Sequence, residues 1–138
     1  MLLRCVNAKH SDELNDRVQD VRKIIKCLNK VSAYALVVKP CLYLLTAYLN
    51  VIRGRKSAER FYLRKARKAA NAQGNTLIEA SSIQNERTWS EKVYNNMARY
   101  WLEYVESLDF VPWQYVCNFN VNVWSTILYS LPISNTYL

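Results

Sequence analysis

Glycine, proline and histidine are scarce in this sequence, and each shortage argues against a class of protein. The 138 residues include 2 Gly, 3 Pro and 1 His. β-Sandwiches and barrels use many Gly and Pro residues in their turns, so the shortage favours helices. A zinc site needs clustered ligands, and the 4 Cys form no C-x-x-C pair beside the single His. We therefore expect no metal or cofactor, and free buried thiols in a reducing, cytoplasmic compartment.

Motifs for nucleotide binding and catalysis are also missing. Gly54 and Gly74 are the only glycines, so no G-x-x-x-x-G-K-[ST] phosphate loop can be formed. Glu103 and Glu106 lie three residues apart, but no histidine or metal-binding set joins them for acid–base chemistry. A Ser-His-Asp arrangement would have to use His10, near the start of the chain. The sequence predicts no catalytic residues, and so no enzyme in this chain by itself.

No hydrophobic run is long enough, without interruption, to predict a membrane span. The closest is 31–52, but Lys39 and Pro40 stand near its middle. Proline disfavours helix at the preceding residue, and a lysine at mid-bilayer costs about 3 kcal/mol. We predict a loop followed by a buried core helix. The opening MLLRCVNAKH is a short apolar stretch broken by Arg4, which does not predict a signal peptide.

What the sequence does contain is hydrophobic residues at helical spacing. They make up 51% of the chain, enough for the core of one domain. The predicted helices cover 12–30, 41–53, 57–73, 76–88 and 90–108. Short connections predict antiparallel neighbours, and a helix pair of about 34 residues resembles a tetratricopeptide unit. We predict an all-α fold of antiparallel helical hairpins over 1–114. For the tail, 115–138, a docked helix, a strand suggested by FNVNVW, and a poorly packed segment remain open.

Gly54 and Gly74 are predicted to end two of these helices, because glycine adopts the left-handed conformation at a helix C-terminus without a Cβ penalty. For the 57–73 helix, the spacing predicts one apolar side and one basic side. The apolar side would hold Ala58, Phe61, Tyr62, Ala66 and Ala69, and the basic side would hold Arg60, Arg64, Arg67 and Lys68. In the 76–88 helix, Leu77, Ile78 and Ile83 are expected to face inward.

The net charge of +8 is concentrated in 53–68, where eight basic residues are opposed only by Glu59. The simplest interpretation is a solvated helix face. An acidic protein partner or an anionic lipid surface is the next alternative. Nucleic acid is disfavoured, because Phe61 and Tyr62 are expected on the side away from the arginines, and stacking requires both on one surface.

Several stretches taken in order resemble the extreme C-terminal part of the soluble, bicarbonate-responsive adenylyl cyclases. They are KPCLYLLTAYLNVIRG, FYLRKARKAANAQGNTLIEA, NERTW and YWLEYVESLDFVPW. The landmarks are Pro40, Leu42, Tyr43, Ala47, Tyr48, Gly54, Ala66, Gln73, Gly74, Asn75, Glu79, Asn85, Trp89, Trp101, Leu102, Ser107, Leu108 and Trp113. The resemblance covers about 20–114. It implies a helical-repeat end of a longer protein whose cyclase domains lie elsewhere, and it carries over no catalytic, metal, bicarbonate or nucleotide residue.

Two functional hypotheses follow. The first is a non-catalytic helical interaction or regulatory module that packs against the remainder of a cyclase-like protein, or against another protein, in cAMP biosynthesis. Trp101, Tyr104 and Trp113 would be its apolar anchors. The second is a small basic helical adaptor that binds nucleic acid or an anionic membrane through 53–68. Its candidate contact residues are Arg60, Arg64, Arg67 and Lys68.

Overall fold

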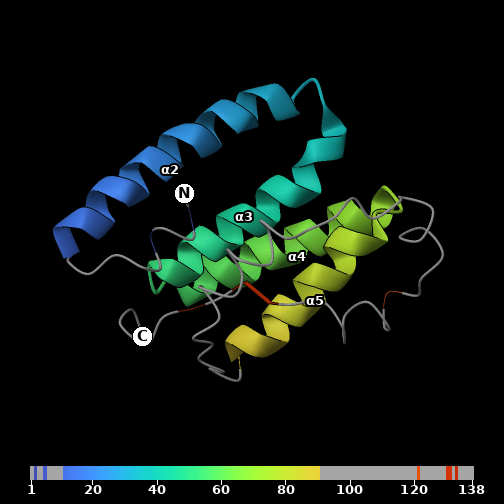
Figure 1. The fold of residues 1–138 in the computed structure, drawn as a ribbon. Coiled ribbons are helices and arrows are strands. Elements are labelled where there is room, and N and C mark those ends of the chain that lie inside the picture. The colour runs from blue at the N-terminus through green and yellow to red at the C-terminus, as the bar shows by residue number, and fades with distance from the viewer. Residues whose placement is uncertain are drawn as a thin grey trace, which may run out of the picture.

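The fold is all-α, as predicted, and its helices form antiparallel hairpins (Figure 1). The structure is a computed structural model. It describes Leu2, Cys5, residues 11–90, Val121, Ser130, Leu131 and Ile133. Within these residues there are four α-helices and one 3₁₀ turn, and no strand. They are α2 (Ser11–Ser32), η1 (Leu36–Val38), α3 (Lys39–Ile52), α4 (Lys56–Ala72) and α5 (Thr76–Ser90).

Each described helix overlaps a range predicted from sequence, and its ends differ from the predicted ones by at most two residues. The predicted helix at 90–108, apart from Ser90 at the end of α5, and most of the tail lie outside the described residues. Val121, in the stretch that alternates like a strand, has helical backbone. Pro40 lies in the first turn of α3, where its missing N–H costs nothing. The segment 31–52 therefore contains the end of α2, a turn, η1 and the buried helix α3, and no described helix is long and apolar enough to cross a membrane.

Two glycines set the paths between α3, α4 and α5. Gly54 and Gly74 have φ of 67° and 65°, the left-handed region in which only glycine is unstrained. After α3, Gly54 N–H donates to Val51 O at 2.9 Å and Arg55 N–H donates to Asn50 O at 2.8 Å. The same pair of bonds recurs around Gly74 after α4. These are Schellman motifs, which satisfy the last carbonyls of a helix and reverse the chain within three residues.

The start of α5 is fixed by Asn75, directly after the second glycine. Its Oδ1 accepts the Ile78 N–H at 3.1 Å, so Asn75 is the N-cap of α5. The Asn71 amide on α4 donates weakly to Glu79, at 3.4 Å to the nearer oxygen. The Gln-Gly-Asn step thus ends one helix and begins the next, and α4 packs against both α3 and α5.

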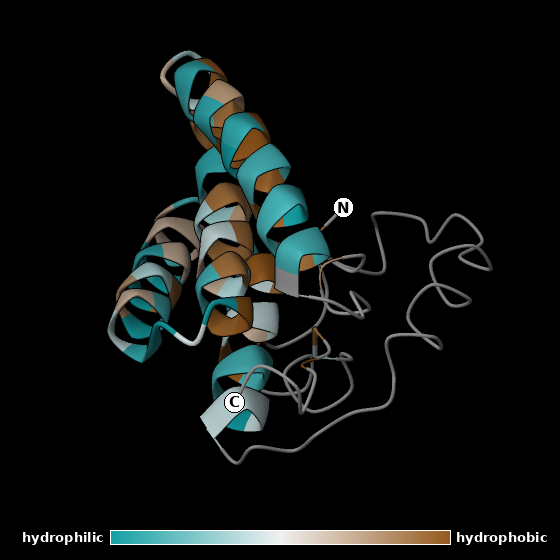
Figure 2. Cartoon of the chain, turned by 90° about the vertical axis from the view of Figure 1, so that its left-hand side faces the viewer, coloured by the Kyte–Doolittle hydropathy of each residue, from teal (hydrophilic) through white to brown (hydrophobic). Residues whose placement is uncertain are grey.

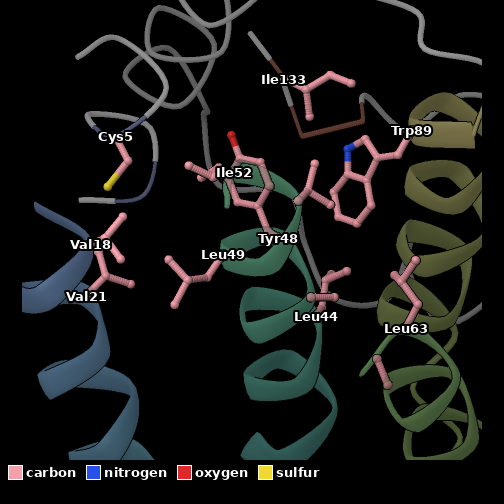
Figure 3. Packing of buried hydrophobic residues seen from close by; sticks show 13 residues of the cluster. Cys5, Val18, Val21, Leu44, Tyr48, Leu49, Ile52, Leu63, Trp89 and Ile133 are labelled. Atoms are coloured by element: carbon pink, nitrogen blue, oxygen red, sulfur yellow. The ribbon is translucent and has the colours of Figure 1, made fainter. Parts of the chain in front are cut away.

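The core is centred on Tyr48 of α3 (Figure 3). Tyr48 is 1% exposed, and its ring stacks on Trp89 of α5 with centroids 5.8 Å apart and planes 9° apart. Val18 and Val21 bring α2 to the other side of α3. Aromatic stacking adds to the free energy gained by burying both rings. Figure 2 shows hydrophobic residues gathered where the helices face one another and hydrophilic residues on their outer turns.

The structure corrects two expectations about which helix residues are inside. On α4 the buried residues are Leu63, Ala66 and Ala70, and Phe61 is exposed, so the predicted apolar side was displaced around the helix. The inward residues of α5 are mainly small or polar, in place of the expected Leu77, Ile78 and Ile83, which are half-buried. They are Ala80, Ser82, Asn85, Thr88 and Trp89.

The cysteines also differ from expectation. Among those described, Cys5 is buried, but Cys27 on α2 and Cys41 on α3 are exposed. The prediction of buried thiols therefore fails for two of the three described positions.

Candidate interaction surfaces

The basic face of α4, defined by Arg60, Arg64, Lys65 and Lys68, is exposed to solvent. Arg60, Arg64 and Lys68 lie four apart along the helix, and Lys65 is next to Arg64, so the four residues occupy neighbouring turns on one side. The closest internal contact of this group is a weak hydrogen bond of 3.4 Å from Arg64 Nε to Arg60 O. This face can attract an anionic partner without breaking an internal ion pair, since none of these four cations is in a salt bridge within the described residues.

Arg67 lies apart from the basic face, although the sequence grouped it there. Its Nη1 pairs with Glu86 Oε2 of α5 at 3.1 Å, and both side chains are nearly half exposed. The guanidinium therefore ties α4 to α5 and is partly neutralised. Surface pairs of this kind contribute at most about 1 kcal/mol. Of the four predicted contact residues on α4, Arg60, Arg64 and Lys68 remain available to a partner.

Phe61 lies on the basic face instead of the apolar side. It is 46% exposed, and the Lys65 ammonium lies 4.7 Å from the centre of its ring. Tyr62, the next residue, is half-buried: its ring contacts the Phe61 ring edge-on at 5.3 Å and meets Tyr43 of α3 with ring centroids 6.4 Å apart. The objection that no aromatic ring shares a surface with the basic residues is therefore wrong for Phe61 and right for Tyr62. Phe61 is the exposed ring among these four cations, and the half-buried Tyr43 ring lies 5.5 Å from the Lys65 ammonium.

An apolar groove lies between α2 and α3. Its volume is about 410 Å³, and its described lining is apolar except for the Tyr48 hydroxyl. The lining residues are Leu2, Val21, Ile24, Ile25, Leu28, Leu45, Tyr48 and Leu131. Ile24 and Leu28 are four residues apart on α2 and are 44% and 38% exposed. Exposed apolar side chains at that spacing, beside a groove, are typical of a surface that receives a partner helix.

A polar clamp on α5, formed by Asn85 and Trp89, holds the main chain of Leu131. Asn85 Oδ1 accepts the Leu131 N–H at 2.6 Å, and Trp89 Nε1 donates to Leu131 O at 3.0 Å. The clamp therefore binds the main chain of a residue that lies 46 positions further along the chain. Ile133 packs beside Trp89 and is 5% exposed (Figure 3). The sequence named Asn85 and Trp89 as landmarks, but their spacing alone gave no sign of what they bind.

A second, smaller cavity of about 90 Å³ opens at the turn between α3 and α4, where Glu59, Lys56 and Arg60 meet Trp89 and Ile133. Burial raises the pKa of the Glu59 carboxyl, while Arg60 and Lys56 oppose the rise and Glu86 adds to it. The charges of Arg60 and Lys56 thus favour the ionised form of the Glu59 carboxyl, although no salt bridge joins them to it within the described residues. In the described part of the chain no three His, Cys, Asp or Glu side chains gather in a way that could hold a metal ion.

The three aromatic anchors expected from sequence, Trp101, Tyr104 and Trp113, lie outside the described residues. Comparison with protein-family models, with curated proteins and with solved structures finds no match. The adenylyl cyclase resemblance therefore rests on the ordered residues quoted above.

Proposed function

We propose that this chain is a non-catalytic helical interaction module, similar to the C-terminal end of a soluble adenylyl cyclase, which packs against the remainder of such a protein. The observation that carries the proposal is the apolar groove between α2 and α3, with Ile24 and Leu28 at its open edge. A stacked array of helical hairpins buries a continuous core only when each unit receives its neighbour. α2 is the first helix of 11–90, and among the described helices it packs mainly against α3. A neighbouring helix therefore fits into the groove that α2 and α3 form together.

The occupant in this proposal is an amphipathic helix that places apolar side chains in the groove at helical spacing. Such a contact would position or regulate cAMP synthesis carried out by domains elsewhere. The described cavities support binding more than chemistry: the larger is lined by hydrocarbon, and the smaller holds Glu59 beside two cations.

The test uses the full chain and a purified soluble adenylyl cyclase that lacks its own C-terminal end. We expect binding by calorimetry and a change in cAMP formation when the chain is added. Ile24→Asp places a charge at the groove and should weaken binding roughly tenfold or more. Gln19→Asp adds the same charge to an exposed position of α2 and should bind as the natural chain does.

Two results would reject the proposal. One is cAMP formation by the chain alone, supplied with ATP and a divalent cation, because it would make the chain catalytic. The other is equal binding by Ile24→Asp and the natural chain, because the groove would then have no part in the contact.

The second candidate, a basic adaptor acting through 53–68, is favoured by the exposed Phe61 ring among the cations of α4. An aromatic ring beside cations is the combination that single-stranded nucleic acids bind. Replacing Arg60, Arg64 and Lys68 with Ala should weaken oligonucleotide binding and lower its salt slope by about 2. Replacing Arg22, Lys23 and Lys26 of α2 removes equal charge and serves as the control. Binding that ignores salt, or that is lost equally in both triple variants, would exclude this candidate.

A further inference from the structure

The exposed hydrophobic residues of this protein are concentrated at one turn. Six of the seven large hydrophobic side chains that are exposed among the described residues lie between Ile24 and Val37. Four of them lie where α2 ends and the chain turns toward α3, a region that we call the apolar tip. They are Val31, Tyr34, Leu36 and Val37, which are 54%, 94%, 59% and 69% exposed. Figure 1 shows this turn at one extremity of the described helices.

The apolar tip is surrounded by positive charge along the chain. Between Val21 and Ala58 there is no Asp or Glu, and the C-terminal half of α2 carries Lys26 and Lys30 on exposed positions. Lys39 follows the tip at the start of α3. Lysine side chains can extend their ammonium groups to lipid headgroups while their hydrocarbon stems lie against apolar surface. Each cation close to an anionic leaflet adds to the attraction.

Several backbone groups of the apolar tip are already hydrogen-bonded inside the protein. The N–H groups of Tyr34 and Ala35 both donate to Val31 O at 3.0 Å, and that of Val38 donates to Ala35 O at 3.2 Å. The Gln73 amide, from the end of α4, donates to Leu36 O at 2.8 Å. Because unsatisfied backbone groups are costly in an apolar medium, this pairing lowers the cost of placing the turn among acyl chains.

We propose that the apolar tip inserts into the interfacial region of an anionic lipid bilayer, so that the protein binds the membrane surface without crossing it. Tyrosine and aliphatic side chains enter the boundary between headgroups and acyl chains, and the flanking lysines meet the lipid phosphates. A protein partner fits the tip less well. Four side chains at a convex turn expose on the order of 500 Å², whereas each side of a stable protein interface buries about 800 Å². Neither function proposed above uses this surface.

The experiment is co-flotation of the full chain with vesicles of phosphatidylcholine alone, or of phosphatidylcholine with phosphatidylserine. We expect binding to the anionic vesicles that weakens with salt. Leu36→Asp with Val37→Asp should reduce the partition coefficient roughly tenfold or more. Asn15→Asp with Gln19→Asp is the matched control, because it adds the same two negative charges at exposed positions in the N-terminal half of α2 and should bind as the natural chain does. Circular dichroism verifies that both variants keep their helices.

Three outcomes would overturn the proposal. The natural chain would fail to float with anionic vesicles. Alternatively, a third variant, Phe61→Asp, would abolish flotation while the tip variant still binds, which would assign the membrane contact to the basic face of α4. Finally, light scattering would show a dimer that the tip variant dissociates, with no lipid dependence, which would assign the tip to a second copy of the chain. None of these results bears on binding at the groove, so this proposal and the interaction-module proposal fail separately.

Discussion

The polar clamp on Leu131 gives the sharpest test of the packing described here, through the substitution Asn85→Ala. The Asn85 side chain is 1% exposed and makes two hydrogen bonds. Its amide nitrogen donates to Ser81 O at 2.7 Å, and its oxygen accepts the Leu131 N–H at 2.6 Å. Alanine removes the acceptor, and the Leu131 N–H is left beside the stacked rings of Trp89 and Tyr48 without its partner.

The expected loss of stability follows from the unpaired Leu131 N–H. A buried group that loses its hydrogen-bond partner costs about 1–3 kcal/mol. Leu131 is itself half-buried, so the lower part of that range applies, about 1–2 kcal/mol, or a factor of roughly 5–30 in the opening equilibrium. The Ser81 carbonyl keeps its helical partner, so its loss adds little.

The assay is amide hydrogen exchange at Leu131, supported by urea denaturation. We expect Asn85→Ala to accelerate exchange at this amide by the factor just given, because the amide exchanges when the clamp opens. The control is Asn71→Ala on α4, an exposed asparagine whose bond to Glu79 is 3.4 Å long. Its effect should stay below about 0.5 kcal/mol. Unchanged exchange at Leu131 in Asn85→Ala, or equal effects of the two variants, would refute the clamp.

Three further predictions concern the core, a turn and the pH dependence of stability. Leu63 is fully buried, so Leu63→Ala should lower the free energy of unfolding by about 2–5 kcal/mol, while Phe61→Ala should lower it far less. Chemical denaturation measures both losses. Equal losses would support the apolar side of α4 that was predicted from the sequence. At Gly74 an added Cβ meets nothing within 4 Å, so Gly74→Ala should lose only the strain of the left-handed backbone, about 1–2 kcal/mol of stability, and Gly74→Asn should lose less. Thermal denaturation measures both losses. A larger loss would mean that a steric clash, and not the positive φ, requires glycine at this position. Burial raises the pKa of the Tyr48 phenol, with a smaller contribution from Cys5. The unfolded chain therefore releases this proton first, near pH 10, and the stability present at lower pH should fall as the pH rises above that value. Tyr48→Phe should reduce that fall in urea titrations, and an unchanged pH profile would contradict the burial of the phenol.

Hairpin geometry could be predicted from the sequence because its causes are local. Gly54 and Gly74 end helices through a conformation that depends on the missing Cβ, and Pro40 begins one through its fixed φ. Neither effect needs a distant partner. For the same reason the helices of 11–90 lie within two residues of their predicted ends.

The buried face of α4 could not be predicted, since it depends on where α3 and α5 lie. Residues 58, 61, 62, 66 and 69 gave a plausible apolar side, but α4 lies between two helices. Burial therefore centres on Leu63 and Ala70, and Phe61 is left outside. An amphipathic pattern indicates that a helix has an inner face, and its neighbours decide the centre of that face.

The inward side of α5 was missed for a different reason. Ser82, Asn85 and Thr88 have polar side chains, yet each donates to the carbonyl four residues earlier, at 2.7–2.9 Å. A polar group that is satisfied by its own helix can be buried at little cost, and a hydropathy pattern does not register this.

The sequence by itself determined that this chain folds into helices separated by two glycine turns, because helix spacing and helix ends are set within a few residues. Only the tertiary structure decided which surfaces remain for partners: the groove at Ile24 and Leu28, the basic face around Phe61, and the apolar tip. Exposure is what remains after neighbouring helices have packed, so it depends on contacts between residues far apart in the chain. The hydrogen bond from the Leu131 N–H to Asn85 joins residues 46 positions apart and is one such contact.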